Sequence, residues 1–262
     1  MSLVTLTRET ATGIATLCFN RPEVLNALDV PTARAFREAA MPLSEDPAVR
    51  CIVLKGNGRA FVAGGDLAGF AEDFDLAAAV VDDLLDALHP VIEMLAHHDA
   101  PVIAAVHGAV AGAGLSLMAA CDLVVAAEGT RFLMAYDRIG AAPDCGGTYF
   151  LPRVVGMRRA AELMLLSPTW TAEEARAAGL VNRVVAADRL DTETTALATR
   201  IAQGPTRAYG AYKRLASEAF SRPLHDHLEA ERAAFRQATR TEDFRVGVQA
   251  FLGKQPPRFQ GR

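Results

Sequence analysis

Three glycine-rich segments of the sequence carry the residues best suited to chemistry, and two of them suggest groups that bind an oxyanion. These two are GNGRAFVAGGDLAGF (56–70) and HGAVAGAGLSL (107–117). In each, glycines stand where a strand is expected to give way to a helix, and the first N–H groups of a helix have no acceptor within it. Two N–H groups that converge on a carbonyl oxygen form an oxyanion hole, where losing one donor costs ~3–4 kcal/mol of transition-state stabilisation. A plain glycine turn is the alternative for the first segment.

The third segment, GAAPDCGGTYFLPRVVG (140–156), holds an isolated acid. Asp144 lies in a turn rich in proline and glycine, just before a helix expected to begin near Thr148. Because the surrounding stretch is almost without charge, removal of water can favour the protonated form of a carboxyl group there. Asp144 fits two roles at this point: a group that transfers protons, or an ordinary helix cap. The neighbouring Cys145 is expected to be a small buried thiol rather than a nucleophile.

The hydrophobic pattern predicts the strands and helices that must position these segments. Strands are expected over 4–10 and 13–19, joined as a hairpin, and over 50–56, 101–107 and 122–128. Helices are expected over 31–44, capped by Asp29 or Val30, over 75–98 with a kink at Pro90, and over 112–120. Strands that alternate with helices in this way predict an α/β fold.

After residue 155 the sequence becomes a succession of helical segments. They are expected over 154–166, 171–180, 190–203, 206–220, 224–238 and 241–253. We therefore divide the chain into an α/β core over 1–200 and a C-terminal helical region over 201–262, whose core is too small to stand alone. Residues 200–262 hold 12 Lys/Arg against 6 Asp/Glu, whereas the first 199 residues hold 15 against 25. This basic excess fits either a solvated helical face or contact with an anionic ligand or an acidic neighbouring subunit.

Length and composition exclude several classes of protein. The chain has 262 residues, 51% hydrophobic and 22% charged, with a net charge of −4, which indicates one or two globular domains and excludes disorder and disulfide scaffolds. The basic residues are too diluted by acids for nucleic-acid binding. The stretch over 100–121 is apolar enough to cross a membrane, but Pro101 and its glycines favour a buried strand and a buried helix. Four irregularly spaced cysteines and the lack of a secretory signal favour a cytoplasmic protein.

Taken in order together with FNRPEVLNAL (19–28), the three segments resemble the enoyl-CoA hydratase/isomerase family, also called the crotonase superfamily. The resemblance covers essentially the whole chain, including AEEARAAGLVNRVV (172–185) and TEDFRVGVQAFLGKQPPRF (241–259). It implies a crotonase-like spiral of ββα repeats, a C-terminal helical region for trimerisation, and an acyl-CoA thioester as substrate. It also implies a homotrimer or a dimer of trimers, with no metal and no separate cofactor, because coenzyme A is part of the substrate.

The same resemblance assigns roles to individual residues. The oxyanion donors would be the main-chain N–H groups of Gly65 and Ala113. Coenzyme A would lie along Val24, Asn26, Ala63, Gly64, Asp66 and Leu67. Lys254 would reach a phosphate of the coenzyme, and Tyr136 would line the acyl pocket.

Departures from the family pattern narrow the set of reactions that the protein is expected to catalyse. Hydratases of the family place two glutamates around the β-carbon, and the matching positions here are Ser116 and Tyr136, neither of which can act as a carboxylate base near neutral pH. Asp144 matches a position that isomerases use. One carboxylate can remove a proton at one carbon and return it at another while an oxyanion hole holds the dienolate. We therefore expect an isomerase that shifts a double bond or rearranges an aryl-epoxide CoA thioester, in fatty acid metabolism or phenylacetate degradation.

Within the family the similarity is strongest to isomerases of ring-1,2-epoxyphenylacetyl-CoA. It rests on AGAGLSL (111–117), FLMAYDRIG (132–140) and PDCGGTYFLPR (143–153). One departure is that Asp66 follows Gly65 directly, where those isomerases have Gln before Asp. Three alternatives stay open: a hydratase, and so a lyase, without the usual glutamates; an enzyme similar to the 4-chlorobenzoyl-CoA dehalogenases; and an acyl-CoA-binding protein without activity.

The dehalogenase alternative uses the same acid differently. These enzymes resemble VVGMRRAAELML (154–165) and have a nucleophilic Asp matching Asp144, an assisting His matching His89 and a pocket Trp matching Tyr136. They differ by a bulky aromatic residue where this chain has Gly65. His89 also fits a plain position on a helix face beside Pro90.

Overall fold

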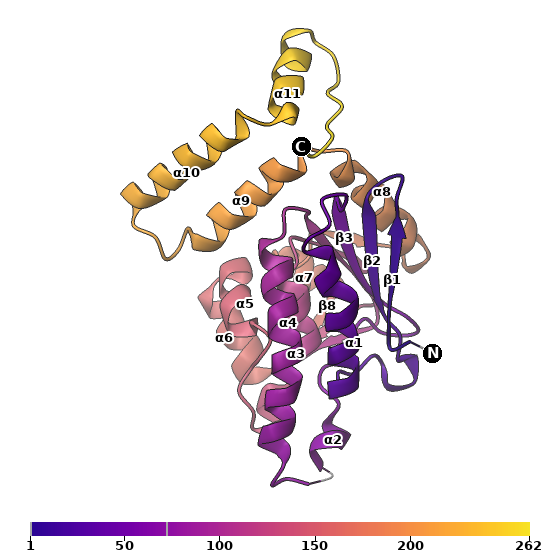
Figure 1. Ribbon diagram of the computed structural model, residues 1–262. Helices are drawn as coiled ribbons and strands as arrows, with labels where there is room; N and C mark the ends of the chain where they lie inside the picture. Colours follow the sequence, from indigo (N-terminus) through magenta and orange to yellow (C-terminus); the bar gives the residue numbers. More distant parts are fainter. Residues whose placement is uncertain (1, 72) are drawn as a thin grey trace.

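The main sheet has six strands and is parallel except at one edge. The computed structural model describes residues 2–71 and 73–262. In the order β1-β2-β3-β4-β6-β9 the strands are Val4–Glu9, Ile14–Phe19, Cys51–Gly56, Val102–Val106, Leu123–Ala127 and Arg183–Val185. β1 and β2 form the predicted antiparallel hairpin, with Val4 opposite Phe19, and the later pairs are parallel (Figure 1). The sequence pattern predicted all of these strands except β9.

Helices cover both faces of this sheet because its central strands β3, β4 and β6 turn apolar side chains to both sides. Ile52 and Leu54 of β3 join the core beneath α1 (Val30–Ala40) and α3 (Ala77–His97). Cys51 and Val53 join the core beneath α8 (Leu190–Ala202) on the other face. Asp29 is the cap of α1, since its carboxylate accepts the N–H of Thr32 at 2.8 Å. The α-helix ends at Ala40, earlier than predicted, and a 3-10 turn follows over Met41–Leu43.

A second, three-stranded sheet winds the chain into a spiral. β5 (Ala109–Ala111) pairs with β7 (Arg131–Leu133), which pairs with β8 (Trp170–Thr171). Val62 adds an isolated bridge to Val110 of the same sheet. A main-sheet strand is thus followed by a short extended segment and then by a helix, as in β4, β5 and α4 (Ala113–Ala119). This arrangement confirms the α/β fold of ββα repeats, although the hydrophobic pattern did not predict the short strands.

The apolar stretch over 100–121 forms the interior of the protein. It becomes β4, β5 and α4, and all the residues of β4 and α4 are buried. The predicted strand and helix are therefore confirmed to within about a residue at each end. In the part of the chain that the structure describes, no helix is both long enough and apolar enough to pass through a bilayer.

Three further helices complete the body of the molecule. They are α5 (Gly147–Val155), α6 (Met157–Leu166) and α7 (Ala172–Ala177). Gly156, at a φ of +81°, separates α5 from α6, so the single helix predicted over 154–166 is wrong. Thr171 begins α7 with a capping box to Glu174.

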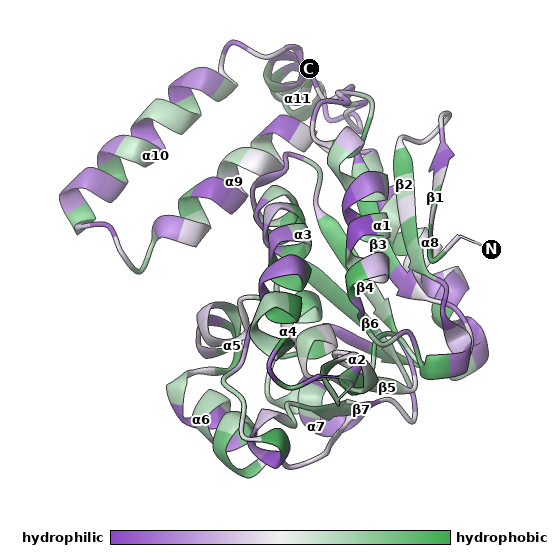
Figure 2. Ribbon diagram, turned by 60° about the horizontal axis from the view of Figure 1, so that its bottom comes forward, coloured by the Kyte–Doolittle hydropathy of each residue, from purple (hydrophilic) through white to green (hydrophobic). Residues whose placement is uncertain are grey.

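The last helices form an arm that projects from the body (Figure 1). α9 (Thr206–Glu218) docks through Lys213, whose buried ammonium donates to Leu95 O at 2.9 Å and lies 2.8 Å from Asp122 Oδ2. None of the fifteen described residues of α10 (Leu224–Ala238) is buried, and of the eleven in α11 (Glu242–Leu252) Asp243 alone is buried. Both helices mix apolar and polar residues along their length (Figure 2). The division predicted after residue 200 falls inside α8, which packs on the sheet as far as Ala202.

Candidate active site

Two glycine turns meet at the entrance to α4. Gly64 has a φ of +106° and Gly112 a φ of +49°, both in the region that favours glycine. A Cβ on Gly64 would lie 3.9 Å from Gly112 Cα, and a Cβ on Gly112 would lie 3.6 Å from Gly64 Cα. The two predicted oxyanion segments are therefore in contact, and the residues that follow these glycines, Gly65 and Ala113, are brought to the same place.

The main-chain N–H groups of Gly65 and Ala113 are available to a ligand. Leu28 donates its N–H to Gly64 O and accepts the N–H of Asp66, both at 2.8 Å, so this parallel bridge uses the residues on either side of Gly65. Ala113 is the first residue of α4, where an N–H has no partner within the helix. Among the described residues, neither N–H has a hydrogen-bond acceptor. The geometry allows two donors at one point, as an oxyanion hole requires.

Tyr136 connects these turns to the isolated acid. It begins a 3-10 turn (Tyr136–Ile139) that follows Ala135 at a φ of +60°. Its ring atom Cε2 lies 3.9 Å from where a Cβ on Gly112 would stand, and its phenol donates a hydrogen bond to Asp144 Oδ1. All three predicted segments thus meet in one site, although they are far apart in the sequence.

The turn that carries Asp144 excludes the capping interpretation of this residue. Cys145 and Gly146 both have positive φ values, +50° and +78°, and Gly147 donates its N–H to the main-chain oxygen of Asp144 at 2.9 Å. α5 begins at Gly147, one residue before the predicted start, with Gly146 as its cap and no side-chain cap bond. The carboxylate of Asp144 is directed to Tyr136 instead, so its side chain does not cap α5.

Cys145, next to Asp144, has the inert character that the sequence predicted. Its side chain is buried. Burial, and then the negative charge of Asp144, raise the pKa of the Cys145 thiol. The thiol therefore stays protonated and is a poor nucleophile.

Ser116 lies on α4 beside the start of α5. Its hydroxyl oxygen is fully buried and has no hydrogen-bond partner among the described residues. A Cβ on Gly147 would stand only 2.5 Å from Ser116 Oγ, so the helices that carry Ser116 and follow Asp144 pack closely here. Both positions at which the family's hydratases place glutamates, 116 and 136, are thus near the Asp144 turn.

The residues assigned to coenzyme A by resemblance surround the first glycine turn, with different exposure. Val24 and Leu67 are exposed, Leu67 by 49%, and Ala63 and Asp66 are half-buried. Asn26 is fully buried, and its amide accepts the N–H of Arg21 and donates to Asn57 O and Ala60 O. Its main-chain N–H also donates to Arg21 O at 2.9 Å, so Asn26 holds the loop together from within.

Arg21 is a site residue that the sequence reasoning missed. Its guanidinium lies 3.0 Å from Asp29 Oδ2 and 3.2 Å from Asp66 Oδ2, and it donates to Ala27 O at 2.8 Å. It thereby ties the start of α1 to the residue after Gly65. Its place within FNRPEVLNAL was the available indication.

His89 and Lys254 are two further predicted residues, and both are exposed. His89 lies on α3 and Lys254 beyond α11, and neither side chain makes a hydrogen bond with the described part of the chain. Their roles stay predictions. Within the same residues, no group of three or more His, Cys, Asp or Glu side chains is placed to hold a metal ion.

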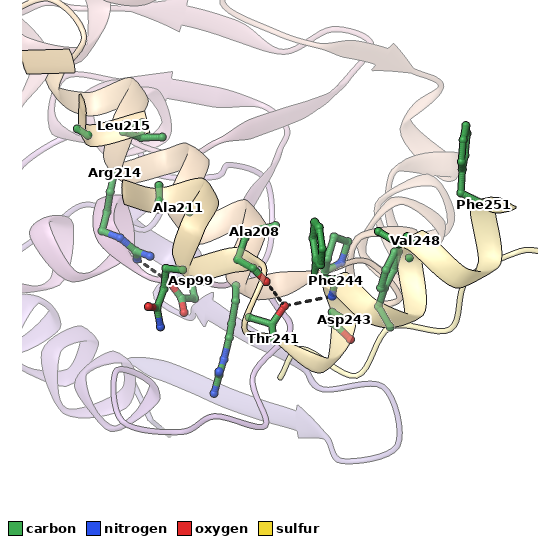
Figure 3. Close-up of a pocket in the computed structure, with 18 of the residues that line it drawn as sticks. Asp99, Ala208, Ala211, Arg214, Leu215, Thr241, Asp243, Phe244, Val248 and Phe251 are labelled. Carbon is green, nitrogen blue, oxygen red and sulfur yellow. Dashed lines mark hydrogen bonds and ion pairs between the residues drawn. The ribbon is translucent and has the colours of Figure 1, made fainter. Parts of the chain in front are cut away.

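A cavity of about 880 Å³ lies away from this site, inside the arm. Its walls come from Asp99 and from α9, α10, α11 and the C-terminal tail. Figure 3 shows Arg214 of α9 paired with Asp99 on one side, at 2.6 Å, and Phe244 and Val248 of α11 on the other. Neither Asp144 nor the two glycine turns contribute to its walls.

A spiral of ββα repeats that sets two free N–H groups near a single carboxylic acid defines the class of protein. The chain belongs to the enoyl-CoA hydratase/isomerase family, whose family model matches residues 9–262. The protein named probable enoyl-CoA hydratase of Rhodobacter capsulatus is 40% identical over the full length of both chains. The 1,2-epoxyphenylacetyl-CoA isomerase of Escherichia coli is 38% identical over 95% of this chain and 96% of its own.

A solved structure shows the same fold. The enoyl-CoA hydratase from a Polaromonas species matches with a TM-score of 0.91 and 34% identity, over 98% of this chain and 99% of that one. The chain is therefore a family enzyme of acyl-CoA metabolism, and its relatives include members named for both hydration and isomerisation.

Proposed function

We propose that the protein is an acyl-CoA isomerase that shifts a double bond or rearranges an aryl-epoxide CoA thioester. The observation that carries the proposal is that the carboxyl group of Asp144, bonded to Tyr136, lies beside the glycine turns that lead to the N–H groups of Gly65 and Ala113, neither of which has an acceptor among the described residues. A hydratase of the usual kind needs two carboxylates, and Ser116 and Tyr136 stand at their positions.

For the double-bond shift, the proposed reaction is a proton transfer between two carbons of one substrate. The N–H groups of Gly65 and Ala113 bind the thioester carbonyl oxygen, which makes a proton on the neighbouring carbon more acidic. Asp144 removes that proton, and the electron pair moves through the conjugated system onto the oxygen, where the two donors hold the charge. Asp144 then returns the proton to a different carbon, so nothing is gained or lost overall.

Coenzyme A belongs to the substrate, and we propose no additional cofactor. Its chain would run past Val24, Ala63, Gly64 and Leu67 and the loop that Asn26 holds, toward Asp66. Lys254 would meet a phosphate. These placements are supported by the exposed position of Val24 and Leu67 beside the Gly65 turn.

We further propose a homotrimer, or a dimer of trimers, in the cytoplasm. The arm supports assembly because it exposes large apolar side chains that a single copy leaves in water. They are Tyr212, Phe220, Leu224, Leu228, Phe235, Phe251 and Leu252. Light scattering after size-exclusion chromatography tests this directly, and a monomer at micromolar concentration contradicts it.

Exchange of substrate protons with solvent deuterium tests the role of Asp144. Wild-type protein should place deuterium at the α or γ carbon of an unsaturated acyl-CoA, and Asp144→Asn should lose at least ~10²-fold of this rate. Asp188→Asn, at an exposed acid in the 3-10 turn before α8, is the matched control and should exchange normally. Exchange that survives Asp144→Asn contradicts the proposal. A panel of aliphatic, dienoyl and aryl-acetyl thioesters then identifies the substrate.

Hydration is the second candidate, favoured by the 40% identity to a protein named probable enoyl-CoA hydratase. Crotonyl-CoA consumed at ~1–10³ per second would establish it in place of isomerisation. Chloride release from 4-chlorobenzoyl-CoA, dependent on His89, would establish a dehalogenase. Binding of acyl-CoA without exchange or turnover would identify a protein without activity.

A further inference from the structure

The phenol of Tyr136 is held in one place by the structure around it. Its side chain is 8% exposed and sits in a 3-10 turn flanked by Ala135 and Gly140, at φ values of +60° and +68°. The ring packs beside Gly112, where an added Cβ would stand in van der Waals contact with Cε2 at 3.9 Å. A buried ring with a fixed main chain on both sides has little freedom to turn away from Asp144.

The Tyr136 phenol is a donor that keeps its proton. Burial first, and then the charge of Asp144 and the hydrogen bond to it, raise the pKa of the Tyr136 phenol. The other titratable group that faces the carboxyl is the Cys145 thiol, which is also protonated. Among the described residues, no Lys, Arg or His forms an ion pair with Asp144. The phenol is therefore the strongest polar contact that orients this carboxyl.

We propose that Tyr136 is a positioning residue that gives the two oxygens of Asp144 different tasks. Its phenol holds Oδ1, and Oδ2 is left to take the proton from the substrate and return it. This inference rests on the proposed function, since it needs Asp144 to be the acid/base. Without the phenol the carboxyl can rotate about its Cβ–Cγ bond, and either oxygen, or neither, then faces the substrate.

The hydrogen bond predicts a kinetic signature that packing alone does not produce. A residue that orients Asp144 acts on the proton-transfer step, so its loss should lower kcat and leave KM nearly unchanged. Loss of a residue that merely fills the acyl pocket should change KM as well.

Tyr136→Phe is the test, because it removes one oxygen and keeps the ring. We expect kcat for proton exchange to fall about 10- to 100-fold, and KM for the acyl-CoA to change less than about twofold. Tyr149→Phe is the matched control on the helix that follows Asp144. It removes a phenol that donates to Ser217 O at 3.0 Å, and it should change none of these values.

A second variant, which alters the phenol without removing it, keeps the test decisive if Tyr136→Phe is poorly folded. Site-specific 3-fluorotyrosine at 136 has nearly the same shape and a more acidic phenol, so it should donate more strongly to Asp144 and change kcat while KM stays the same. An unchanged kcat in both variants overturns the positioning role while Asp144→Asn remains inactive. If Asp144→Asn still exchanges protons, the proposed function itself fails.

Discussion

Helices α4 and α2 (Leu67–Ala71) each follow a glycine turn, and each lies next to one donor of the proposed oxyanion hole. They differ in burial, because all seven residues of α4 are buried and none of the five described residues of α2 is. Gly114 of α4 is pressed against Val62 O, where a Cβ would stand at 2.2 Å. At Gly69 of α2, an added Cβ would meet nothing within 4 Å among the described atoms. The donor at Ala113 is therefore fixed by the core.

The donor at Gly65 is fixed by a few polar contacts instead. The bridge to Leu28 and the pair between Arg21 and Asp66 hold its turn from one side. Changes near α4 should thus affect stability and activity together, whereas changes around α2 should affect activity with little loss of stability.

A change from glycine to alanine in each of the two helices should give the largest difference in stability. Gly114→Ala should lower the free energy of unfolding by about 3 kcal/mol or more, because its methyl group collides with main chain. Gly69→Ala should leave it unchanged or raise it by up to ~1 kcal/mol, since alanine is the better helix former. Urea denaturation followed by circular dichroism measures both. Equal losses in the two variants would show that the helices are not held differently.

Arg21→Gln tests whether polar contacts position the Gly65 donor. Two ion pairs and the bond to Ala27 O are lost, so we expect about 1–2 kcal/mol lower stability and a kcat reduced about 5- to 10-fold. Arg34→Gln is the control, because its pair with Asp83 at 3.0 Å is exposed and worth less than ~1 kcal/mol. A normal kcat in Arg21→Gln would mean that the turn keeps its shape unaided.

Leu67→Ala should give the smallest effect and one confined to binding. Removing an exposed apolar contact to coenzyme A costs about 1 kcal/mol, which is about fivefold in KM. Stability and kcat should stay the same. Leu165→Ala on α6, at a leucine that is also exposed but lies outside the site, is the comparison. A KM that rises in both variants would argue against a role for Leu67 in binding coenzyme A.

Most helices and strands of the body could be predicted from local sequence, whereas the short strands that were not predicted depend on pairing with distant residues. Asp29 and Thr171 mark helix starts by their own side chains, so both helices were predicted. β5, β7 and β8 have two or three residues each and exist because Val110 pairs with Phe132 and Phe132 with Trp170. Such strands are too short to show a periodicity.

The residues of the site could be predicted from the sequence better than the hydrogen bonds between them. Glycines and an isolated acid pointed to Gly65, Ala113 and Asp144, but the bond from Tyr136 to Asp144 was not foreseen. The turns on either side of this hydrogen bond hold Ala135 and Cys145 in the left-handed region of the main chain. Residues other than glycine rarely adopt this conformation, and no residue pattern indicates such a turn. The roles of these residues in catalysis stay predictions.

Lys213 imposes an order on the folding of the chain. Its acceptors are Leu95 O and Ala100 O, which lie 118 and 113 residues earlier, together with Asp122 at the start of β6. An ammonium group can leave water only after such partners have gathered, and contacts this distant in sequence form late. We expect α9 to attach in the final folding step. The arm could then meet another copy of the chain, as the proposed trimer requires, only after the body has folded.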